Sequence, residues 1–233
     1  MSGALVAGPL ADFATPTFER GSGRPSKYVL ANGARVPSNT TIGGRFADKG
    51  NLIFWAFNRG KDGFDELYDQ EALSVGSLVH KTIESELNGD AAPLVPKEFA
   101  EQVGKAISAW HEWFAHTSLD LIATEIPLVS EKHRFGGTLD TIVRDQKGRL
   151  AIGDWKSSKA IYADYLVQLA GYRILWNENR PEPITGGFHL VRFSKEHGDM
   201  EHRHYPELDE AESQFLLFRT AYEIDKNLKK RAR

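Results

Sequence analysis

The sequence predicts a single α/β domain in which a mixed β-sheet carries α-helices on its faces. Two observations on the pattern of apolar residues indicate this class: helical periodicity dominates up to about residue 118, and strand-like runs replace it from Asp120 onward. A third observation is composition. The 233 residues, 41% hydrophobic and 26% charged, are sufficient to bury one large core.

The N-terminal part begins with residues 1–27, whose alanine, glycine, proline and serine content predicts a flexible leader without regular structure. Residues 28–38 are expected to form a short hairpin, because Asn32-Gly33 suits a tight turn with positive φ. Residues 40–60 are expected to start a helix with an apolar stripe. The stretch TIGGRF, residues 41–46, lacks the lysine and hydroxyl of a phosphate-binding Walker loop, so a turn is favoured there.

Two amphipathic helices follow. Residues 68–89 repeat apolar side chains at helical spacing, and Gly89 is the expected stop signal. Residues 96–117 form the second helix, with Pro96 near its start. These elements complete an expected N-terminal helical part, 28–118.

The expected sheet part, 119–233, starts with three strand-like runs that read as a meander. A helix is expected to end at Arg180-Pro181, and a strand pair and a closing helix follow it. The elements expected in this part are strands 121–129, 135–143 and 149–156, helix 162–179, strands 184–193 and 200–205, and helix 207–230. Together the two parts, 28–233, are expected to form one domain.

The composition limits the kinds of metal site and binding partner that the chain can have. The chain has no cysteine, which excludes disulfides, zinc ribbons and cysteine-held iron–sulfur clusters. A bound metal would need oxygen or imidazole ligands, which favours Mg²⁺ or Mn²⁺. The formal net charge of −3 argues against a broad basic surface but permits a local basic groove. No signal peptide or membrane-spanning run is apparent, so we expect a soluble, cytoplasmic protein.

Two aspartates stand in neighbouring expected strands. If residues 145–149 form the loop of a hairpin centred on Lys147, then Asp140 and Asp154 lie opposite each other on one face of the sheet. Lys156, two residues after Asp154, shares that face, and the Trp155 side chain points to the other. A register slip of one residue would break this arrangement.

Facing carboxylates raise each other's pKa unless a cation lies between them, and a divalent metal would supply that cation. The Trp155 carbonyl could add an oxygen ligand, and Lys156 could orient water or stabilise charge on a phosphate. The alternative is a structural Asp–Lys ion pair at a strand end. That alternative is favoured for an isolated Asp-x-Lys, but the second aspartate in register shifts the balance toward a metal site.

The same segments resemble a known family. Gly137-Thr138-Leu139-Asp140, then Asp154-Trp155-Lys156, then Gln168-Leu169-Ala170-Gly171-Tyr172 resemble the motifs of the PD-(D/E)XK nuclease superfamily. The similarity is closest to its RecB-like exonuclease branch, which includes small phage and mitochondrial members. That branch also has an upstream Gly-x-x-x-His helix, matched here by Gly76-Ser77-Leu78-Val79-His80. The motifs occur in the family's order over about residues 73–193.

The resemblance implies a restriction-endonuclease-like core, an α/β mixed sheet flanked by helices, within 28–233. It assigns the metal ligands to His80, Asp140, Asp154 and the carbonyl of Trp155. It makes Lys156 the catalytic lysine and places Gln168 and Tyr172, one helical turn apart, over the site. Glu125 fits an additional acidic position of some members. The chain has aspartate where the family often has glutamate at position 154, and it lacks the cluster cysteines of several relatives.

The implied activity is Mg²⁺- or Mn²⁺-dependent hydrolysis of DNA by an exonuclease, in recombination, repair or processing of phage or bacterial DNA. DNA is the implied partner, and a recombination or single-strand-annealing protein is a further partner that the resemblance allows. Two alternatives remain: a catalytically silent subunit that binds DNA ends, and an endonuclease of the same superfamily. The retained lysine and aspartates disfavour the first, and the His80 and Gln168–Tyr172 motifs disfavour the second.

Some residues outside these motifs are candidates for DNA contact. Arg45, Lys49 and Arg59 could meet phosphates, and Trp55 or Phe57 could stack on a base, although a core-facing aromatic stripe is the stronger expectation. The basic C-terminal residues 229–233 could also touch DNA, although a solvated tail is the usual outcome. Glu84, one turn after His80, is expected either to support that histidine or to be solvated.

Overall fold

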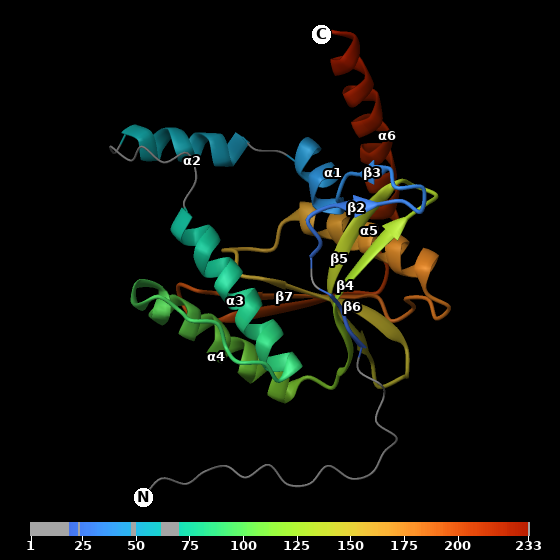
Figure 1. The fold of residues 1–233 in the computed structure, drawn as a ribbon. Coiled ribbons are helices and arrows are strands. Elements are labelled where there is room, and N and C mark those ends of the chain that lie inside the picture. The colour runs from blue at the N-terminus through green and yellow to red at the C-terminus, as the bar shows by residue number, and fades with distance from the viewer. Residues whose placement is uncertain (1–18, 23, 48–49, 62–69, 233) are drawn as a thin grey trace, which may run out of the picture.

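The computed structural model describes residues 19–22, 24–47, 50–61 and 70–232. Its centre is a six-stranded sheet with the strand order β1-β4-β5-β6-β7-β8, and β2 and β3 form a separate two-stranded hairpin (Figure 1). The strands are β1 Glu19–Arg20, β2 Tyr28–Val29, β3 Arg35–Val36, β4 Asp120–Ser130, β5 Phe135–Arg144, β6 Leu150–Lys156, β7 Phe188–Phe193 and β8 Met200–Tyr205. The helices are α1 Asn39–Phe46, α2 Gly50–Lys61, α3 Gln70–Asn88, α4 Ala100–His116, α5 Ala163–Asn179 and α6 Asp209–Arg231, with a 3₁₀ turn Lys97–Phe99 before α4.

The sheet is mixed, as predicted. Strands β4, β5 and β6 form the expected antiparallel meander. The chain then crosses through α5 and returns as β7, parallel to β6, and β8 pairs antiparallel with β7. A strand, a crossover helix and a parallel strand in one sheet require a connection of this length, and α5 supplies it. The α/β architecture with helices flanking a mixed sheet is therefore confirmed.

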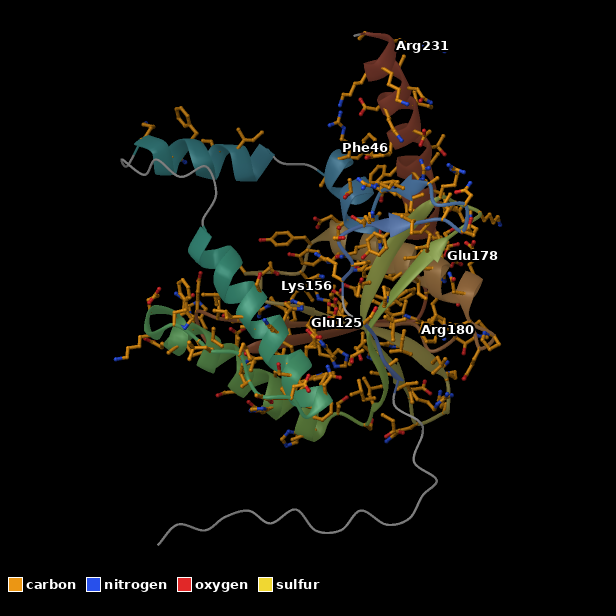
Figure 2. All side chains as sticks on the ribbon, in the orientation of Figure 1. Phe46, Glu125, Lys156, Glu178, Arg180 and Arg231 are labelled. Carbon is orange, nitrogen blue, oxygen red and sulfur yellow. The ribbon has the colours of Figure 1, made fainter. Side chains whose placement is uncertain are left out.

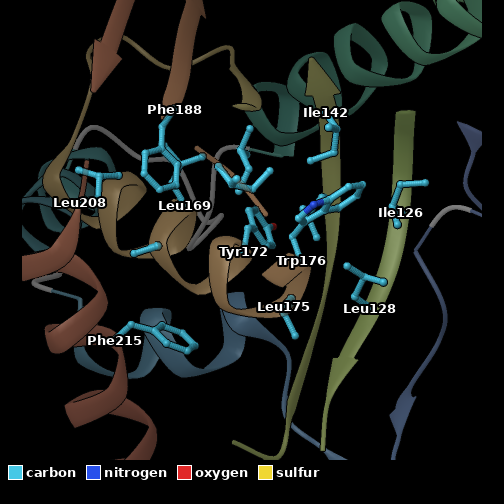
Figure 3. Close-up of a cluster of buried hydrophobic side chains, with 14 of the residues drawn as sticks. Ile126, Leu128, Ile142, Leu169, Tyr172, Leu175, Trp176, Phe188, Leu208 and Phe215 are labelled. Carbon is cyan, nitrogen blue, oxygen red and sulfur yellow. The ribbon is translucent and has the colours of Figure 1, made fainter. Parts of the chain in front are cut away.

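Helices cover both faces of the sheet. The core on one face joins α5 to strand residues and to Ile42 of α1 and Phe215 of α6; Figure 3 shows Tyr172 and Trp176 of α5 and Ile142 of β5 among the side chains of this core. These five side chains are at most 4% exposed, so their removal from water favours folding.

The core on the other face lies under α3 and α4. Trp113 of α4 meets the ring of Trp155 with centroids 5.0 Å apart, and Val79 of α3 and Phe193 of β7 belong to the same cluster. Trp155 therefore faces away from the side on which Ile152, three residues earlier in β6, joins the first core. The prediction that Trp155 points to the opposite face of the sheet is confirmed.

Turn and cap residues explain several boundaries. Gly33 has φ +80° in the hairpin between β2 and β3, where the chain turns through a Leu30–Ala34 backbone hydrogen bond. Gly89, with φ +69°, directly follows the last residue of α3, as predicted. Asp145 accepts hydrogen bonds from the backbone N–H groups of Lys147 and Arg149, and this closes the predicted loop between β5 and β6.

Three local predictions are wrong. Glu19–Arg20 forms β1, parallel to β4, although the leader was expected to have no regular structure. Residues 40–60 contain two helices, α1 and α2, in place of one. The stretch 41–46 lies within α1 and is not a turn, because the Ser38 side chain caps the helix at Thr41 N–H and Ile42 is completely buried. Capping and burial outweigh the low helix propensity of Gly43 and Gly44.

The proposed contacts of α2 are only partly visible. Phe57 is 62% exposed, so this side chain does not belong to a core-facing stripe. Lys49 and the side chains of Trp55 and Arg59 lie outside the described residues.

None of the helices in the described ranges has the length and apolar character needed to span a bilayer.

Candidate active site

Strands β5 and β6 bring the two aspartates together. The paired residues Thr141↔Gly153, Ile142↔Ile152 and Val143↔Ala151 establish the predicted register, which places Asp140 opposite Asp154, one position beyond the Thr141↔Gly153 pair. Asp154 is 1% exposed. Its Oδ1 is buried without a hydrogen-bond partner among the described residues, so one carboxylate oxygen remains available for a ligand.

Lys156 lies next to this carboxylate. Its Nζ is 2.5 Å from Asp154 Oδ2, and its side chain is 15% exposed. The same ammonium donates to Gln168 Oε1 at 3.2 Å, and Gln168 Nε2 donates to the Tyr172 hydroxyl at 2.9 Å. Gln168 and Tyr172 come from neighbouring turns of α5, and this helix contacts the lysine through Gln168.

The charges in this group influence one another. Burial raises the pKa of Asp154 to about 6 against the opposing effect of the Lys156 ammonium, and the Asp140 carboxylate adds to the rise. Burial alone would lower the pKa of Lys156, but the carboxylates of Asp154 and Asp140 outweigh it and raise that pKa above its ordinary value. Lys156 is therefore a charged ammonium at neutral pH.

His80 approaches from α3. Its Nδ1 is 3.9 Å from Asp140 Oδ2, and its imidazole makes a hydrogen bond to the Trp155 carbonyl. Burial, together with the Lys156 ammonium, lowers the pKa of His80 well below its ordinary value, although 35% of the side-chain surface stays exposed. The imidazole is thus neutral at pH 7 and keeps a lone pair for a ligand.

The motif glycine Gly76 brings α3 close to the end of β6. A Cβ atom at this position would lie 2.9 Å from Ser157 Oγ, which is closer than real Cβ contacts allow. The glycine therefore lets α3 pack near β6 at the level where His80 reaches the site. Figure 2 shows Lys156 and Glu125 near the centre of the molecule, beside this helix.

Glu125 lies across from Asp140 on β4. It has φ +50°, a left-handed conformation that is uncommon for a residue with a side chain, between paired residues Thr124 and Ile126. Burial raises the pKa of Glu125 to about 8, and the carboxylates of Asp140 and Glu84 contribute. An unusual backbone conformation and a perturbed carboxyl at one position are typical of functional sites.

The donor set suits a hard divalent cation. No group of three or more His, Asp or Glu side chains within the described ranges forms a ready-made metal cage. However, the carboxylates of Asp140 and Asp154 and the imidazole of His80 lie close enough to influence one another, and His80 bonds to the Trp155 backbone. Among the described residues, Asp154 Oδ1 has no hydrogen-bond partner and is available to a cation. Mg²⁺ and Mn²⁺ accept such mixed oxygen-rich sets and retain water for the remaining positions.

Two residues at the site, Asn39 and Arg24, were not predicted, and one motif glycine has a packing role that the sequence did not indicate. Asn39, 2% exposed at the start of α1, donates from Nδ2 to the Gln168 carbonyl at 2.8 Å. Arg24 lies in the segment expected to be a leader, and its positive charge lowers the pKa of Glu125 and of Tyr172 against the larger effect of burial. Gly171 leaves room for Asn39, since a Cβ atom there would lie 2.7 Å from Asn39 Oδ1. Only Gly171 belonged to a recognised motif.

The pH dependence of the stability of the metal-free protein should be set in part by Glu125. Between the ordinary glutamate pKa near 4.5 and about 8, the folded chain keeps a proton on Glu125 that the unfolded chain has released. The free energy of unfolding should therefore fall as pH rises through this window. Glu125→Gln should reduce this loss, most clearly between pH 6.5 and 8, as measured by urea unfolding in EDTA. The exposed Glu98→Gln serves as control, and equal slopes for all three proteins would contradict the expectation.

Comparison with known proteins agrees with this geometry. Residues 54–226 match the sequence model of the PD-(D/E)XK nuclease superfamily. A search of curated proteins finds no match. Among solved structures, the chain is similar to an alkaline exonuclease (LHK-Exo) from Laribacter hongkongensis, with 14% identity, a TM-score of 0.35, and coverage of 67% of this chain and 84% of that one.

A second solved structure, of the protein SSO0001, has 15% identity and a TM-score of 0.31, and the alignment covers 72% of this chain and 81% of that one. Identities and TM-scores are low in both cases, so the assignment rests on the family match, which spans most of the sequence. The chain belongs to the PD-(D/E)XK nuclease superfamily.

Proposed function

We propose that this protein is a Mg²⁺- or Mn²⁺-dependent deoxyribonuclease that acts as an exonuclease. The observation that carries the proposal is the buried Asp154 carboxylate, set in register with Asp140 and 2.5 Å from Lys156, in a chain that belongs to a nuclease superfamily. Burying the Asp154 carboxylate, with Asp140 and Lys156 half-buried beside it, is costly for folding, and a role in phosphodiester hydrolysis explains why these residues are present.

Asp140, Asp154 and the Trp155 carbonyl would hold the metal, with His80 as a further ligand. A divalent cation bound there would neutralise the carboxylates, polarise a phosphate oxygen and lower the pKa of a coordinated water. His80 is suited to this position because its imidazole is neutral at pH 7. Glu125 would give up its proton when a cation approaches, since positive charge lowers the pKa of a neighbouring carboxyl.

Lys156 would act through its positive charge. The raised pKa keeps the amine protonated, which favours stabilisation of negative charge on the phosphate, and orientation of water, over proton abstraction. Asp154 and Gln168 hold the ammonium from two sides, so it needs little reorganisation when the substrate binds. Tyr172 fixes Gln168 in turn, and both are therefore positioning residues for the lysine.

An exonuclease is favoured over an endonuclease by the motifs shared with the RecB-like branch, namely Gly76 to His80 on α3 and Gln168 with Tyr172 on α5. The substrate would be DNA, in recombination, repair or processing of phage or bacterial DNA. A recombination or single-strand-annealing protein would be a suitable partner, and the cytoplasm a suitable location. The silent end-binding subunit is disfavoured because Asp140, Asp154 and Lys156 are all retained.

Activity is expected to require a divalent metal. Protein freed of metal with EDTA should not digest DNA, and Mg²⁺ or Mn²⁺ should restore digestion, because the ligands are oxygens and one imidazole. Calcium should bind but support little turnover, since its looser coordination positions water poorly.

The measurement is digestion of DNA labelled separately at its 5′ and 3′ ends, with and without each metal. Early release of mononucleotides from one labelled end indicates an exonuclease, whereas internal fragments indicate the endonuclease alternative. Complete degradation in EDTA would contradict the metal requirement.

A further inference from the structure

Two segments that the sequence associated separately with phosphate contact lie side by side in the fold. Arg45 is in α1, and the basic residues Lys229, Lys230 and Arg231 are in the last turn of α6. The helices are joined by an ion pair between Arg45 Nη2 and Asp225 Oδ2 at 2.7 Å, and by the rings of Phe46 and Phe218 at 5.1 Å. Figure 2 shows Phe46 near the base of the projecting half of α6 and Arg231 at its end.

A groove of about 710 Å³ lies between these helices, and we name it the α1–α6 groove. Its charged lining consists of Arg45, Asp225, Lys226, Lys229 and Lys230. Four cations thus surround one carboxylate, although the whole chain has a net charge of −3. Positive charge is therefore concentrated in this groove, although the chain as a whole is negatively charged.

The single carboxylate does not neutralise this groove. Asp225 Oδ2 is shared between Arg45 at 2.7 Å and Lys229 Nζ at 3.1 Å. Within the part of the chain that the structure describes, no carboxylate pairs with Lys226 or Lys230. Both lysines are exposed, so two ammonium groups are free to bind an anion.

The shape and chemistry of the groove favour an extended polyanion. Lysine ammonium groups are flexible point charges, which suit phosphates along a backbone better than one small ligand that needs a fixed geometry. The half-buried Tyr222 also lines the groove and adds a flat apolar surface beside the cations. A sugar–phosphate backbone offers both repeated negative charge and apolar sugar faces.

The groove is also connected to the active site through α1. Asn39, the first residue of this helix, donates a hydrogen bond to the Gln168 carbonyl, and the Gln168 side chain accepts one from Lys156. The same short helix therefore contacts Gln168, the hydrogen-bond partner of Lys156, at one end, and its Arg45 lines the groove at the other end. A nucleic acid strand leaving the site along α1 would reach the groove.

We infer that the α1–α6 groove is a second nucleic-acid site, which binds the phosphodiester backbone at a distance from the bond that is cut. The identity of the polymer as DNA rests on the proposed function. Such a contact would keep a substrate attached between successive cleavages, because it adds affinity that does not depend on the reacting nucleotide.

The test compares the DNA affinity of the double variant Lys226→Ala/Lys230→Ala with that of the wild type. Both are measured in EDTA, so that binding is recorded without cleavage. Fluorescence anisotropy with a labelled duplex of about 30 base pairs gives the Kd at several salt concentrations. The slope of log K against log salt should become shallower by about two, and affinity at about 0.1 M salt should fall roughly 10-fold or more. Alanine favours helix, so α6 should remain folded, which circular dichroism checks.

The control is Lys147→Ala, which removes an exposed lysine from the β5–β6 loop. Unchanged Kd and salt slope in the double variant would overturn the proposal, as would an equal loss in Lys147→Ala, because that would indicate a general charge effect. Loss of binding in the double variant alone supports the groove even if wild-type protein fails to cut DNA with Mg²⁺. The binding assay therefore tests the groove, and the cleavage assay tests the proposed function, so that either proposal can fail without the other.

Discussion

Asp140→Asn is expected to lower single-turnover DNA cleavage by roughly 10³-fold while leaving the protein folded. The substitution removes a negative charge that a divalent cation needs. It also relieves the repulsion that contributes to the raised pKa of Glu125, so the metal-free protein should be at least as stable as the wild type. The measurement is the rate of label release from end-labelled DNA at saturating Mg²⁺.

Asp154→Asn should lower cleavage to a similar extent as Asp140→Asn, but its effect on stability should differ. Asp154 is almost fully buried and compensates the Lys156 ammonium, so its neutralisation leaves a largely buried cation without its closest partner. We expect a lower melting temperature for this variant and not for Asp140→Asn. Asp120→Asn, an exposed carboxylate at the start of β4, is the control. Near-wild-type cleavage by a folded Asp140→Asn protein would contradict the site.

Lys156→Ala is expected to reduce cleavage by roughly 10²-fold, the scale of losing one positioned electrostatic group, while metal and DNA still bind. In EDTA its melting temperature should fall, since the buried Asp154 loses its counter-charge. Added Mn²⁺ should remove most of that difference, because the metal then neutralises the carboxylates.

These readouts separate the three interpretations of Lys156. A purely structural Asp–Lys pair predicts a loss of stability as the main effect, and a stable Lys156→Ala protein that cleaves like wild type would remove the catalytic role. A silent end-binding subunit predicts no cleavage by either protein and equal DNA affinity. Lys156→Arg retains the charge but changes the position of its donors, and partial recovery of cleavage is expected.

The central geometry could be predicted from sequence because it depends on local rules. The Asp145 to Arg149 loop fixes the register of β5 and β6, and alternation along β6 then places Lys156 on the face of Asp154. Gly89 marked the end of α3, since glycine readily adopts positive φ. Each inference needed only residues close together in the chain.

The remaining parts of the site depend on contacts between distant segments. The left-handed backbone of Glu125 has no signal in a strand-like run, because surrounding structure imposes it. Asn39 is 129 residues from Gln168 in sequence, and the residues around Asn39 in the sequence do not indicate that it contacts α5. The stretch 41–46 was expected to be a turn, and the Ser38 cap together with the burial of Ile42 makes it a helix.

Arg24 illustrates the same limit. It stands in a stretch rich in glycine, serine and proline, which predicts a leader, yet its charge acts on Glu125 and Tyr172 at the site. The parallel pairing of β1 with β4 brings this segment to the sheet, and a two-residue strand leaves no periodic pattern to detect. The division into a leader, 1–27, and one domain, 28–233, stays a prediction.

Isothermal titration with Mn²⁺ tests the central claim most directly, namely that Asp140 and Asp154 share one divalent cation. Metal-free wild-type protein, Asp140→Asn, Asp154→Asn and the control Asp120→Asn are titrated at the same pH, after circular dichroism has established that each is folded. We predict that wild type and Asp120→Asn bind Mn²⁺ with equal affinity, and that each active-site variant binds at least roughly 10-fold more weakly, as for the loss of one charged ligand. Unchanged Mn²⁺ affinity in both active-site variants would contradict the shared site.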